Sequence, residues 1–249
     1  MAIHDAAKAF DGAAGAYERG RPSYPAEAVA WMAEHLPLGP GHTVVDLAAG
    51  TGKFTRLLVP LGATVLAVEP VAGMRAALVA ALSGVEAVDG TAESMPLDDG
   101  SVDAVTAAQA FHWFDGPRAL AEIHRVLRPG GGLGLIWNGR DLEQLLQRRL
   151  DAVIRRYRGA APSHDSGKWR QAFEQTDLFD QFERFEVPWT HQLDEDSAVD
   201  RAMSTSVIAA LPDDERGRVA REVRDIVADA PHPVAMRYVT QVYVCNKRS

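Results

Sequence analysis

The sequence has little cysteine and no excess of basic residues. Its 249 residues include a single cysteine, Cys245, so no disulfide can form within the chain, and a reducing cytoplasm is the expected compartment. Lys and Arg together number 26 against 34 Asp and Glu, giving a formal net charge of −8. The arginines are scattered rather than massed, so we do not expect a nucleic-acid partner.

Long apolar runs are also missing. The longest, Ala76 to Leu82, is far shorter than the ~18 residues that a membrane span requires. The first ten residues lack the apolar core of a signal peptide. We therefore expect a cytoplasmic protein without a membrane partner. Its content of 47% hydrophobic and 24% charged residues is typical of a globular chain with one full-sized core.

Apolar segments along the chain alternate between strand and helix character. Tyr24-Pro25 opens a helix with apolar residues at Val29, Met32, Ala33 and Leu36. Continuous apolar runs then predict strands, and the segments between them predict helices. The strands are 43–48, 64–69, 85–88, 102–107, 133–138, 182–187 and 236–245, and the helices are 51–61, 71–82, 117–127, 142–157 and 213–227. Apolar strands separated by helices indicate a parallel sheet covered on both faces, with ligands at its carboxyl edge.

The segment from Val44 to Thr55 runs from a strand through small residues into a helix. Gly50 and Gly52 can adopt positive φ and let a ligand approach the backbone closely. The N–H groups that open the next helix are unpaired and face the same point. Glu69 ends the next strand 19 residues beyond Gly50, the spacing at which a carboxylate binds a ribose diol. The pattern predicts a site for a nucleoside cofactor.

Two common phosphate motifs do not fit this loop. A dinucleotide fingerprint starting at Gly50 needs a third glycine where Thr55 stands. A P-loop needs Ser or Thr after Gly52-Lys53, where Phe54 stands, and glycine in place of Leu47. Pyrophosphate and nucleoside triphosphates are therefore disfavoured.

What remains resembles the first motif of the class I S-adenosylmethionine-dependent methyltransferases, acidic-x-Gly-x-Gly-x-Gly. Here it is Asp46-x-Ala48-x-Gly50-x-Gly52, and Ala48 in place of the first glycine is expected to exclude a positive φ. The segments 90–97, 101–114 and 127–132 resemble the family's later motifs. They are most similar to the small-molecule branch that includes the ubiquinone and trans-aconitate methyltransferases, and residues 16–25 resemble the segment that precedes the first motif in that branch.

The resemblance implies an α/β, doubly wound, Rossmann-like fold. Its sheet would have seven mostly parallel strands with the last one antiparallel, helices on both faces and a helical cap. We expect residues 1–249 to form a single methyltransferase domain. Its parts would be an N-terminal helical lid (1–40), a cofactor-binding core (41–140), a helical cap (141–180) and C-terminal strands and helices that complete the sheet (181–249).

The resemblance also assigns site residues. S-adenosyl-L-methionine is the expected cofactor, and no metal site is predicted because the histidines show no ligand spacing. The acceptor pocket is expected to include Tyr24, His112, Trp113 and Asn138. The expected cofactor-binding residues are Tyr17, Arg21, Asp46, Ala48, Gly50, Gly52, Glu69, Pro70, Met74, Thr91, Ala92, Glu93, Gln109 and Ala110.

Several of these residues have a structural interpretation as well. Glu93 could stabilise a helix start through its charge, and Tyr17, Arg21 and Tyr24 could fasten the N-terminal segment. His112 is the candidate general base, although aromatic residues at a strand end commonly form core or pocket wall. Arg21 could instead bind a carboxylate of the cofactor or of the acceptor.

The predicted activity is methyl transfer to a small molecule, with O-methylation of a carboxylate slightly favoured over C- and N-methylation. A carboxylate is nucleophilic at pH 7 without a base, whereas an alcohol or phenol benefits from one. A catalytically silent cofactor-binding sensor or scaffold remains an alternative, and a dinucleotide-dependent oxidoreductase a weaker one. The acceptor and the oligomeric state stay open.

Overall fold

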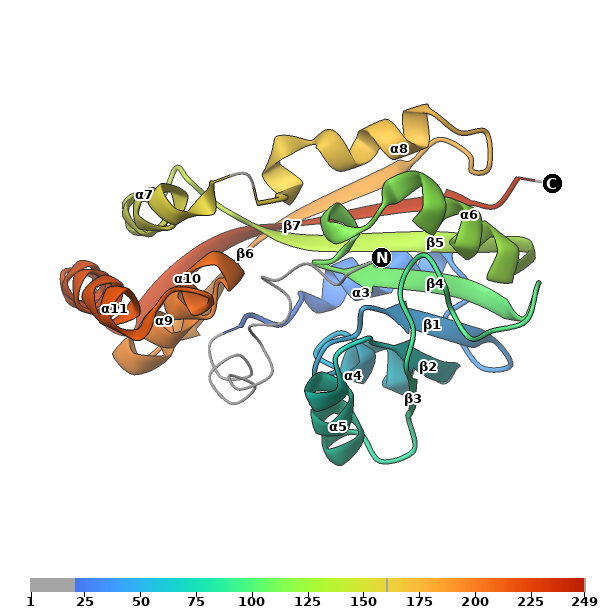
Figure 1. Cartoon of the computed structure of the whole chain (residues 1–249), viewed down its shortest axis with the longest axis horizontal. Coiled ribbons are helices and arrows are strands. Elements are labelled where there is room, and N and C mark those ends of the chain that lie inside the picture. The colour runs from blue at the N-terminus through green and yellow to red at the C-terminus, as the bar shows by residue number, and fades with distance from the viewer. Residues whose placement is uncertain (1–20, 160, 249) are drawn as a thin grey trace. The chain divides into compact units, whose positions relative to one another are not determined.

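A computed structural model describes residues 21–159 and 161–248. Within these residues seven strands form one sheet in the order β3-β2-β1-β4-β5-β7-β6 (Figure 1). The strands are β1 Thr43–Leu47, β2 Thr64–Val68, β3 Glu86–Val88, β4 Val102–Ala108, β5 Leu127–Arg140, β6 Glu183–Leu193 and β7 Val234–Asn246. All seven predicted strands are confirmed, and β5 begins six residues earlier than the apolar run that predicted it.

Strands β1 to β5 pair in parallel, whereas β7 runs against β5. The pairs β2–β3, β1–β2, β1–β4 and β4–β5 are all parallel. Between β5 and β7, Lys247 N donates to Gly131 O and Asp141 N donates to Arg237 O, so one strand rises in number as the other falls. This confirms the Rossmann-like methyltransferase topology with an antiparallel β7.

The predicted helices form, with some changes of length. The helices are α3 Ala26–His35, α4 Thr55–Leu58, α5 Ala72–Ala81, α6 Gly116–Val126, α7 Leu145–Arg158, α8 Gln171–Glu174, α9 Glu195–Met203, α10 Ser206–Ala209 and α11 Asp213–Ala228, with 3₁₀ turns η1 Val59–Leu61, η2 Phe111–Trp113, η3 His164–Ser166 and η4 Lys168–Arg170. The helix expected from residue 51 begins only at Thr55, because residues 51–54 form a turn. The helix expected over 142–157 begins at Leu145, and Leu142 and Leu145 are exposed.

The chain divides into two compact units, and β5, β6 and β7 each supply residues to both. Of the described residues, the larger unit comprises 24–137, 162–187 and 240–248. The smaller unit comprises 21–23, 138–159, 161 and 188–239. We retain the single methyltransferase domain as a proposal, because three strands run through the boundary without a linker.

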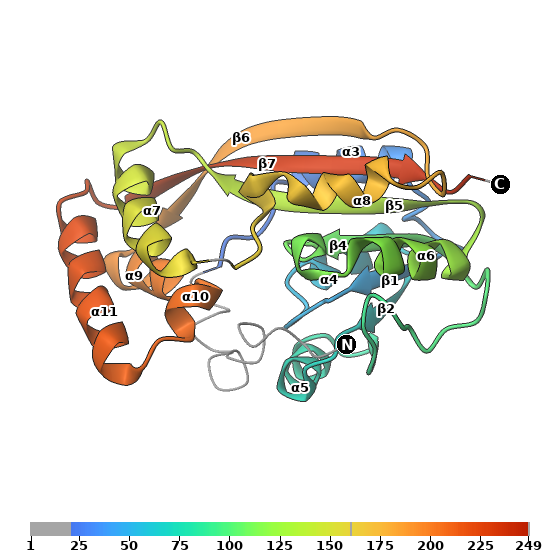
Figure 2. The same cartoon turned by 45° about the horizontal axis from the view of Figure 1, so that its top comes forward.

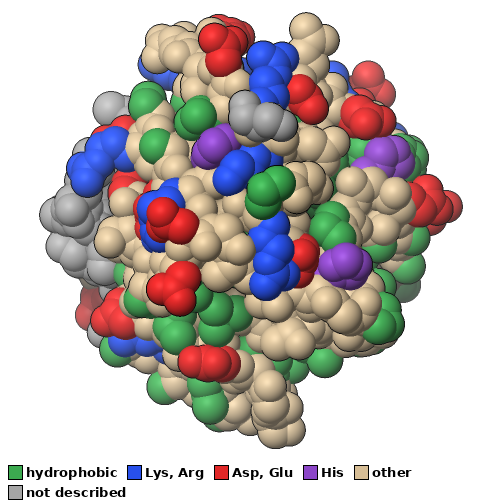
Figure 3. Space-filling model, turned by 90° about the vertical axis from the view of Figure 1, so that its right-hand side faces the viewer, with side chains coloured by type: hydrophobic (Ala, Val, Ile, Leu, Met, Phe, Trp, Pro, Cys, Tyr) green, Lys and Arg blue, Asp and Glu red, His purple; other side chains and the backbone are tan. Residues whose placement is uncertain are grey.

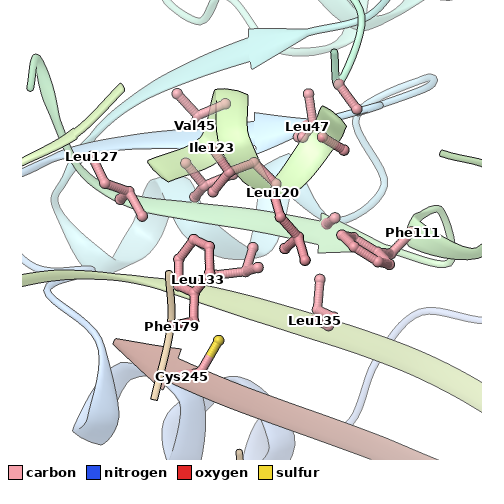
Figure 4. Packing of buried hydrophobic residues seen from close by; sticks show 14 of the residues in the cluster. Val45, Leu47, Phe111, Leu120, Ile123, Leu127, Leu133, Leu135, Phe179 and Cys245 are labelled. Carbon is pink, nitrogen blue, oxygen red and sulfur yellow. The ribbon is translucent and has the colours of Figure 1, made fainter. Parts of the chain in front are cut away.

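Helices cover both faces of the strands of the larger unit (Figure 2), and an apolar cluster lies on each face. On one face α6 and α8 cover Leu133, Leu135 and Cys245, and Figure 4 shows Leu120 and Ile123 of α6 packed toward them. On the other face α3 and α4 cover Val44 and Ile136. Burial raises the pKa of the Cys245 thiol, which fits an inert core residue. Strands buried on both faces explain why their sequences are continuously apolar.

The smaller unit has its own core, built from α7, α9, α10, α11 and the segments of β6 and β7 that belong to it. Tyr238 and Met236 of β7 are almost fully buried there, beside Val223 and Val227 of α11. No helix in the described residues is long and apolar enough to cross a membrane. On the face that Figure 3 shows, acidic and basic side chains are interspersed.

Candidate cofactor site in the larger unit

The loop after β1 has three residues at positive φ. Ala48 has φ 55°, Gly50 has φ 59° and Gly52 has φ 81°. The expectation that Ala48 excludes a positive φ is therefore wrong. Ala48 N and Ala49 N both donate to Val68 O, at 2.8 and 3.3 Å, and these bonds to β2 hold Ala48 in a conformation that costs alanine roughly 1–2 kcal/mol.

The two glycines of this loop have different surroundings. A Cβ on Gly52 would lie 2.9 Å from Leu78 Cγ and Leu82 Cδ1, so Gly52 is needed for packing against α5. A Cβ on Gly50 would find Met74 Sδ at 3.9 Å as its nearest neighbour. Gly50 therefore leaves its backbone open to an approaching ligand, and Met74 lies beside the opening.

Glu69 connects this loop to the start of α5. Its side chain is buried, with Oε2 accepting from Gly50 N and Oε1 accepting from Val71 N, both at 2.9 Å. Burial raises the pKa of Glu69, and the two backbone donors oppose that shift. Each oxygen keeps a second lone pair, so the carboxylate can still accept from a ribose diol.

Asp46 is fully buried in β1. Its Oδ2 accepts a 2.6 Å bond from the Thr55 hydroxyl at the start of α4, and its Oδ1 has no hydrogen-bond partner in the described structure. Burial raises the pKa of Asp46 to about 7, against the effect of Thr55. A buried acceptor that the protein leaves unsatisfied is expected where a ligand or water completes the bonding.

Arg75 of α5 belongs to the same network, although the sequence did not single it out. Its Nη1 donates to the backbone oxygen of Glu69 at 2.7 Å, and it also pairs with Asp89 after β3. Arg75 follows Glu69 by six residues within an alanine-rich helix, and no local motif marks such a contact. It stabilises the segment that carries Glu69.

Beyond β3, residues 91–94 form a tight turn. Thr91 and Ser94 exchange two backbone hydrogen bonds, and Ala92 is buried between them. Glu93 Oε1 accepts from Asp115 N at 2.9 Å, just before α6. The bond to Asp115 N agrees with the structural interpretation of Glu93, at the start of α6. Its neighbours Thr91 and Ala92 remain the better candidates for contact with the adenine of the cofactor.

The segment after β4 brings aromatic rings together at the carboxyl edge. Gln109 has φ 57°, and the buried Ala110 leads into η2, which carries His112 and Trp113. The indole N–H of Trp137 in β5 donates to His112 Nδ1 at 3.2 Å. In the neutral ring the hydrogen then lies on Nε2, so His112 presents a donor there rather than a proton acceptor.

The remaining predicted residues are divided between the units. Tyr24 packs edge-on against Phe54 at the end of the loop, with ring centroids 5.2 Å apart, and Pro70 follows Glu69 in the larger unit. Arg21 and Asn138 belong to the smaller unit, where Arg21 donates to Ser204 O and Asn138 donates to Ser23 O. Tyr17 lies outside the described residues.

These features fit an adenosyl cofactor better than a phosphate ligand. The Asp46 oxygen and the Glu69 carboxylate are hydrogen-bond acceptors, and the backbone beside Gly50 is neutral. Acceptor oxygens repel a phosphate group, whereas they can bind the hydroxyl and amino groups of an adenosyl cofactor. No group of three His, Cys, Asp or Glu side chains among residues 21–159 and 161–248 could hold a metal ion.

Comparison with known proteins shows the family of this chain. A family model for a methyltransferase domain matches residues 45–135. An uncharacterized methyltransferase of Mycobacterium tuberculosis (strain ATCC 25618 / H37Rv) is 42% identical over 241 residues, which are 95% of this chain and 94% of that protein. The chain belongs to the class I S-adenosylmethionine-dependent methyltransferases. S-adenosylmethionine is accordingly the cofactor of this enzyme.

Other relatives match a smaller part of the enzyme. The malonyl-(acyl-carrier protein) O-methyltransferase of Pectobacterium atrosepticum is 37% identical over 130 residues, 50% of this chain and 49% of that protein. The ubiquinone/menaquinone biosynthesis C-methyltransferase of Rubrivivax gelatinosus is 43% identical over 97 residues, 36% of this chain and 37% of that protein. A putative type II methyltransferase structure from Anaeromyxobacter dehalogenans shares the fold, with a TM-score of 0.64 at 24% identity over 92% of this chain and 97% of that one.

The strain at Ala48 gives a first prediction. Ala48→Gly should raise the free energy of unfolding by ~1 kcal/mol, because glycine adopts positive φ without the steric penalty of a Cβ. Ala49→Gly is the matched control and should lower it by ~0.5–1 kcal/mol through added chain entropy. Urea denaturation measures both, and destabilisation by Ala48→Gly would contradict the strained backbone.

The buried Asp46 links stability to pH. Because its pKa is raised from 3.8 to about 7 on folding, the stabilising effect of its proton is complete below about pH 4 and is lost as pH rises through 7. Between about pH 5 and pH 8 the wild type should lose ~2–3 kcal/mol more stability than Asp46→Asn. Denaturation curves at both pH values test this, and equal losses in the two proteins would exclude it.

Proposed function

We propose that the enzyme transfers a methyl group from S-adenosylmethionine to a carboxylate oxygen of a small-molecule acceptor. When bound, the cofactor supplies a methyl group already activated by a sulfonium. The protein then has to align the acceptor oxygen with that methyl and exclude water, and such positioning can contribute ~7–11 kcal/mol. The choice of a small-molecule acceptor follows from the resemblance of the sequence to the small-molecule branch of the family.

The cofactor would be held at the carboxyl edge of β1 to β4. We assign Glu69 to the ribose hydroxyls, the loop backbone at Ala48, Gly50 and Gly52 to the amino-acid part, and the 91–93 turn to the adenine. Asp46, Pro70, Met74, Gln109 and Ala110 complete the proposed contacts. The support is the pair of bonds from Glu69 to Gly50 N and Val71 N, which fixes the carboxylate beside the open loop.

One contact carries the choice of a carboxylate acceptor. Because Trp137 donates to His112 Nδ1, the neutral imidazole has its hydrogen on Nε2 and is arranged to donate to an acceptor oxygen. An alcohol or phenol needs its proton removed, whereas a carboxylate does not. We therefore assign His112 to orientation of the acceptor, with Trp113 as a neighbouring wall, instead of the general-base role.

The relatives alone do not decide between oxygen and carbon. One of the partial matches is an O-methyltransferase and the other a C-methyltransferase. Forming a carbon nucleophile also requires removal of a proton, which the orientation of His112 disfavours. The geometry of His112 thus supports the O-methyl proposal where similarity is neutral.

The ribose assignment of Glu69 predicts a loss of cofactor affinity. Glu69→Gln replaces one acceptor oxygen by an N–H₂ group that faces a backbone N–H, so S-adenosylhomocysteine should bind ~10–100-fold more weakly by calorimetry. Glu86→Gln, an exposed change in β3, is the control and should bind normally. Equal affinity for both variants would reject the assignment.

The carboxylate proposal predicts the chemistry of the product. With methyl-labelled cofactor and a panel of small carboxylic acids, phenols and amines, label should appear in methyl esters, which mild base hydrolyses to labelled methanol. Base-stable label on phenols, amines or carbon would contradict the proposal. His112→Gln should reduce turnover less than the ~10²–10⁴-fold expected from loss of a general base.

A further inference from the structure

The larger unit contains a cluster of polar aromatic rings around the buried Trp137 of β5. The centroid of the Trp137 ring lies 4.4 Å from that of His164 in η3 and 4.7 Å from that of Trp169 in η4. The rings of His164 and Trp169 are nearly parallel, at 22°, with centroids 5.8 Å apart. His112 also neighbours Trp137, at 6.5 Å between centroids. All four rings belong to the same unit as the loop after β1 and Glu69.

Other polar atoms of this cluster find partners within the protein. Trp137 Nε1 donates to His112 Nδ1 at 3.2 Å. The Tyr243 hydroxyl, on a ring packed against Trp169, accepts a 2.6 Å bond from Arg170 Nη2. This is the usual arrangement, because buried polar atoms in folded proteins are nearly always hydrogen-bonded.

Two ring nitrogens of the cluster depart from this arrangement. His164 Nε2 and Trp169 Nε1 are buried and have no hydrogen-bond partner in the described part of the chain. Trp169 is 6% exposed, and the His164 side chain is 12% exposed. Leaving a buried donor or acceptor unpaired costs free energy. Both nitrogens are therefore expected where a ligand or water completes the bonding.

The two nitrogens differ in their hydrogen-bonding character. The indole N–H of Trp169 can only donate. The Asp165 carboxylate lies 3.8 Å from His164 Nδ1, and its negative charge favours a hydrogen on that nitrogen. In the neutral ring Nε2 then carries a lone pair and accepts. The cluster thus offers one donor and one acceptor on neighbouring rings.

A hydroxyl is the small group that satisfies both nitrogens. Its oxygen can accept from Trp169, and its hydrogen can be donated to His164. A carboxylate would satisfy the indole but would bring negative charge to the Nε2 lone pair, and an ammonium group has no lone pair for the indole. Water offers the same donor and acceptor as an alcohol, so a ligand hydroxyl can replace it without losing a hydrogen bond.

We propose that His164 and Trp169 bind a hydroxyl group of the methyl acceptor. This inference rests on the proposed function and narrows its substrate class to a carboxylic acid that also carries a hydroxyl group. His112, assigned to the reacting carboxylate, neighbours the same Trp137 ring as His164, at a separation that an acid of a few carbon atoms can span. The hydroxyl serves recognition, because the methyl goes to the carboxylate.

Paired acids test this contact. Calorimetry on the full chain with S-adenosylhomocysteine present compares malate with succinate, lactate with propionate, and 4-hydroxybenzoate with benzoate. At least one hydroxy acid should bind at least tenfold more tightly than its partner. His164→Phe and Trp169→Phe should each remove that preference, because an aromatic ring stays and the nitrogen is lost. Trp31→Phe, in a separate stack with His35 and Phe185, is the control and should keep it.

Binding of S-adenosylhomocysteine first shows that each variant is folded. His164→Leu replaces His164→Phe if the larger ring is not accommodated. A lack of hydroxyl preference in all three pairs, whether or not the acids bind, would overturn the inference, and so would an equal loss of preference in Trp31→Phe. A crystal structure with the best hydroxy acid should place its hydroxyl between the two nitrogens. Water alone at that position would also overturn it.

Product analysis separates this inference from the proposed function. Methyl esters formed equally well on acids with and without a hydroxyl would refute the hydroxyl contact and leave the proposed function intact. A hydroxyl preference that His164→Phe and Trp169→Phe remove, with methyl transfer to an atom other than a carboxylate oxygen, would retain the contact and reject the proposed function.

Discussion

The geometry of the candidate cofactor site depends on one buried carboxylate that accepts hydrogen bonds from two backbone N–H groups. Glu69 ends β2, and its oxygens bond Gly50 N in the loop after β1 and Val71 N before α5. The loop therefore takes its shape from a neighbouring strand as well as from its own residues. Because the same oxygens have lone pairs left for a diol, the group that shapes the loop is also the group proposed to bind the ribose.

The protein compensates its buried ionisable groups in different ways. At Arg125 two carboxylates compensate the cation, and its pKa rises. At Asp46 burial shifts the pKa to about 7, so the protein can carry this residue neutral. Arg140 cannot do the same, since a guanidinium stays protonated near neutral pH even with its pKa lowered. Asp46 also has a buried oxygen, Oδ1, without a hydrogen-bond partner in the described residues, and such an acceptor is expected where a ligand or water completes the bonding.

Local sequence predicted what depends on local residues. Apolar runs gave the strands because both faces of the sheet are covered, and the small residues at 48–52 with Glu69 gave the loop and its carboxylate. The sequence could not predict that β5 begins at Leu127, because Pro129 and three glycines favour a turn until β4 and β7 pair with them. Nor could it predict a positive φ at Ala48, which bonds to Val68 O impose. The contacts of Trp137 with His112, and of Arg201 with Tyr238, join distant segments, and no spacing rule marks them.

Selectivity for the acceptor follows from what the chemistry leaves to the protein. With the methyl group activated by its sulfonium, reactivity of the acceptor adds little discrimination among carboxylic acids, so discrimination has to come from binding. An apolar wall separates substrates that differ by a methylene only ~10–200-fold, whereas buried polar groups reject a molecule that leaves them unpaired far more strongly.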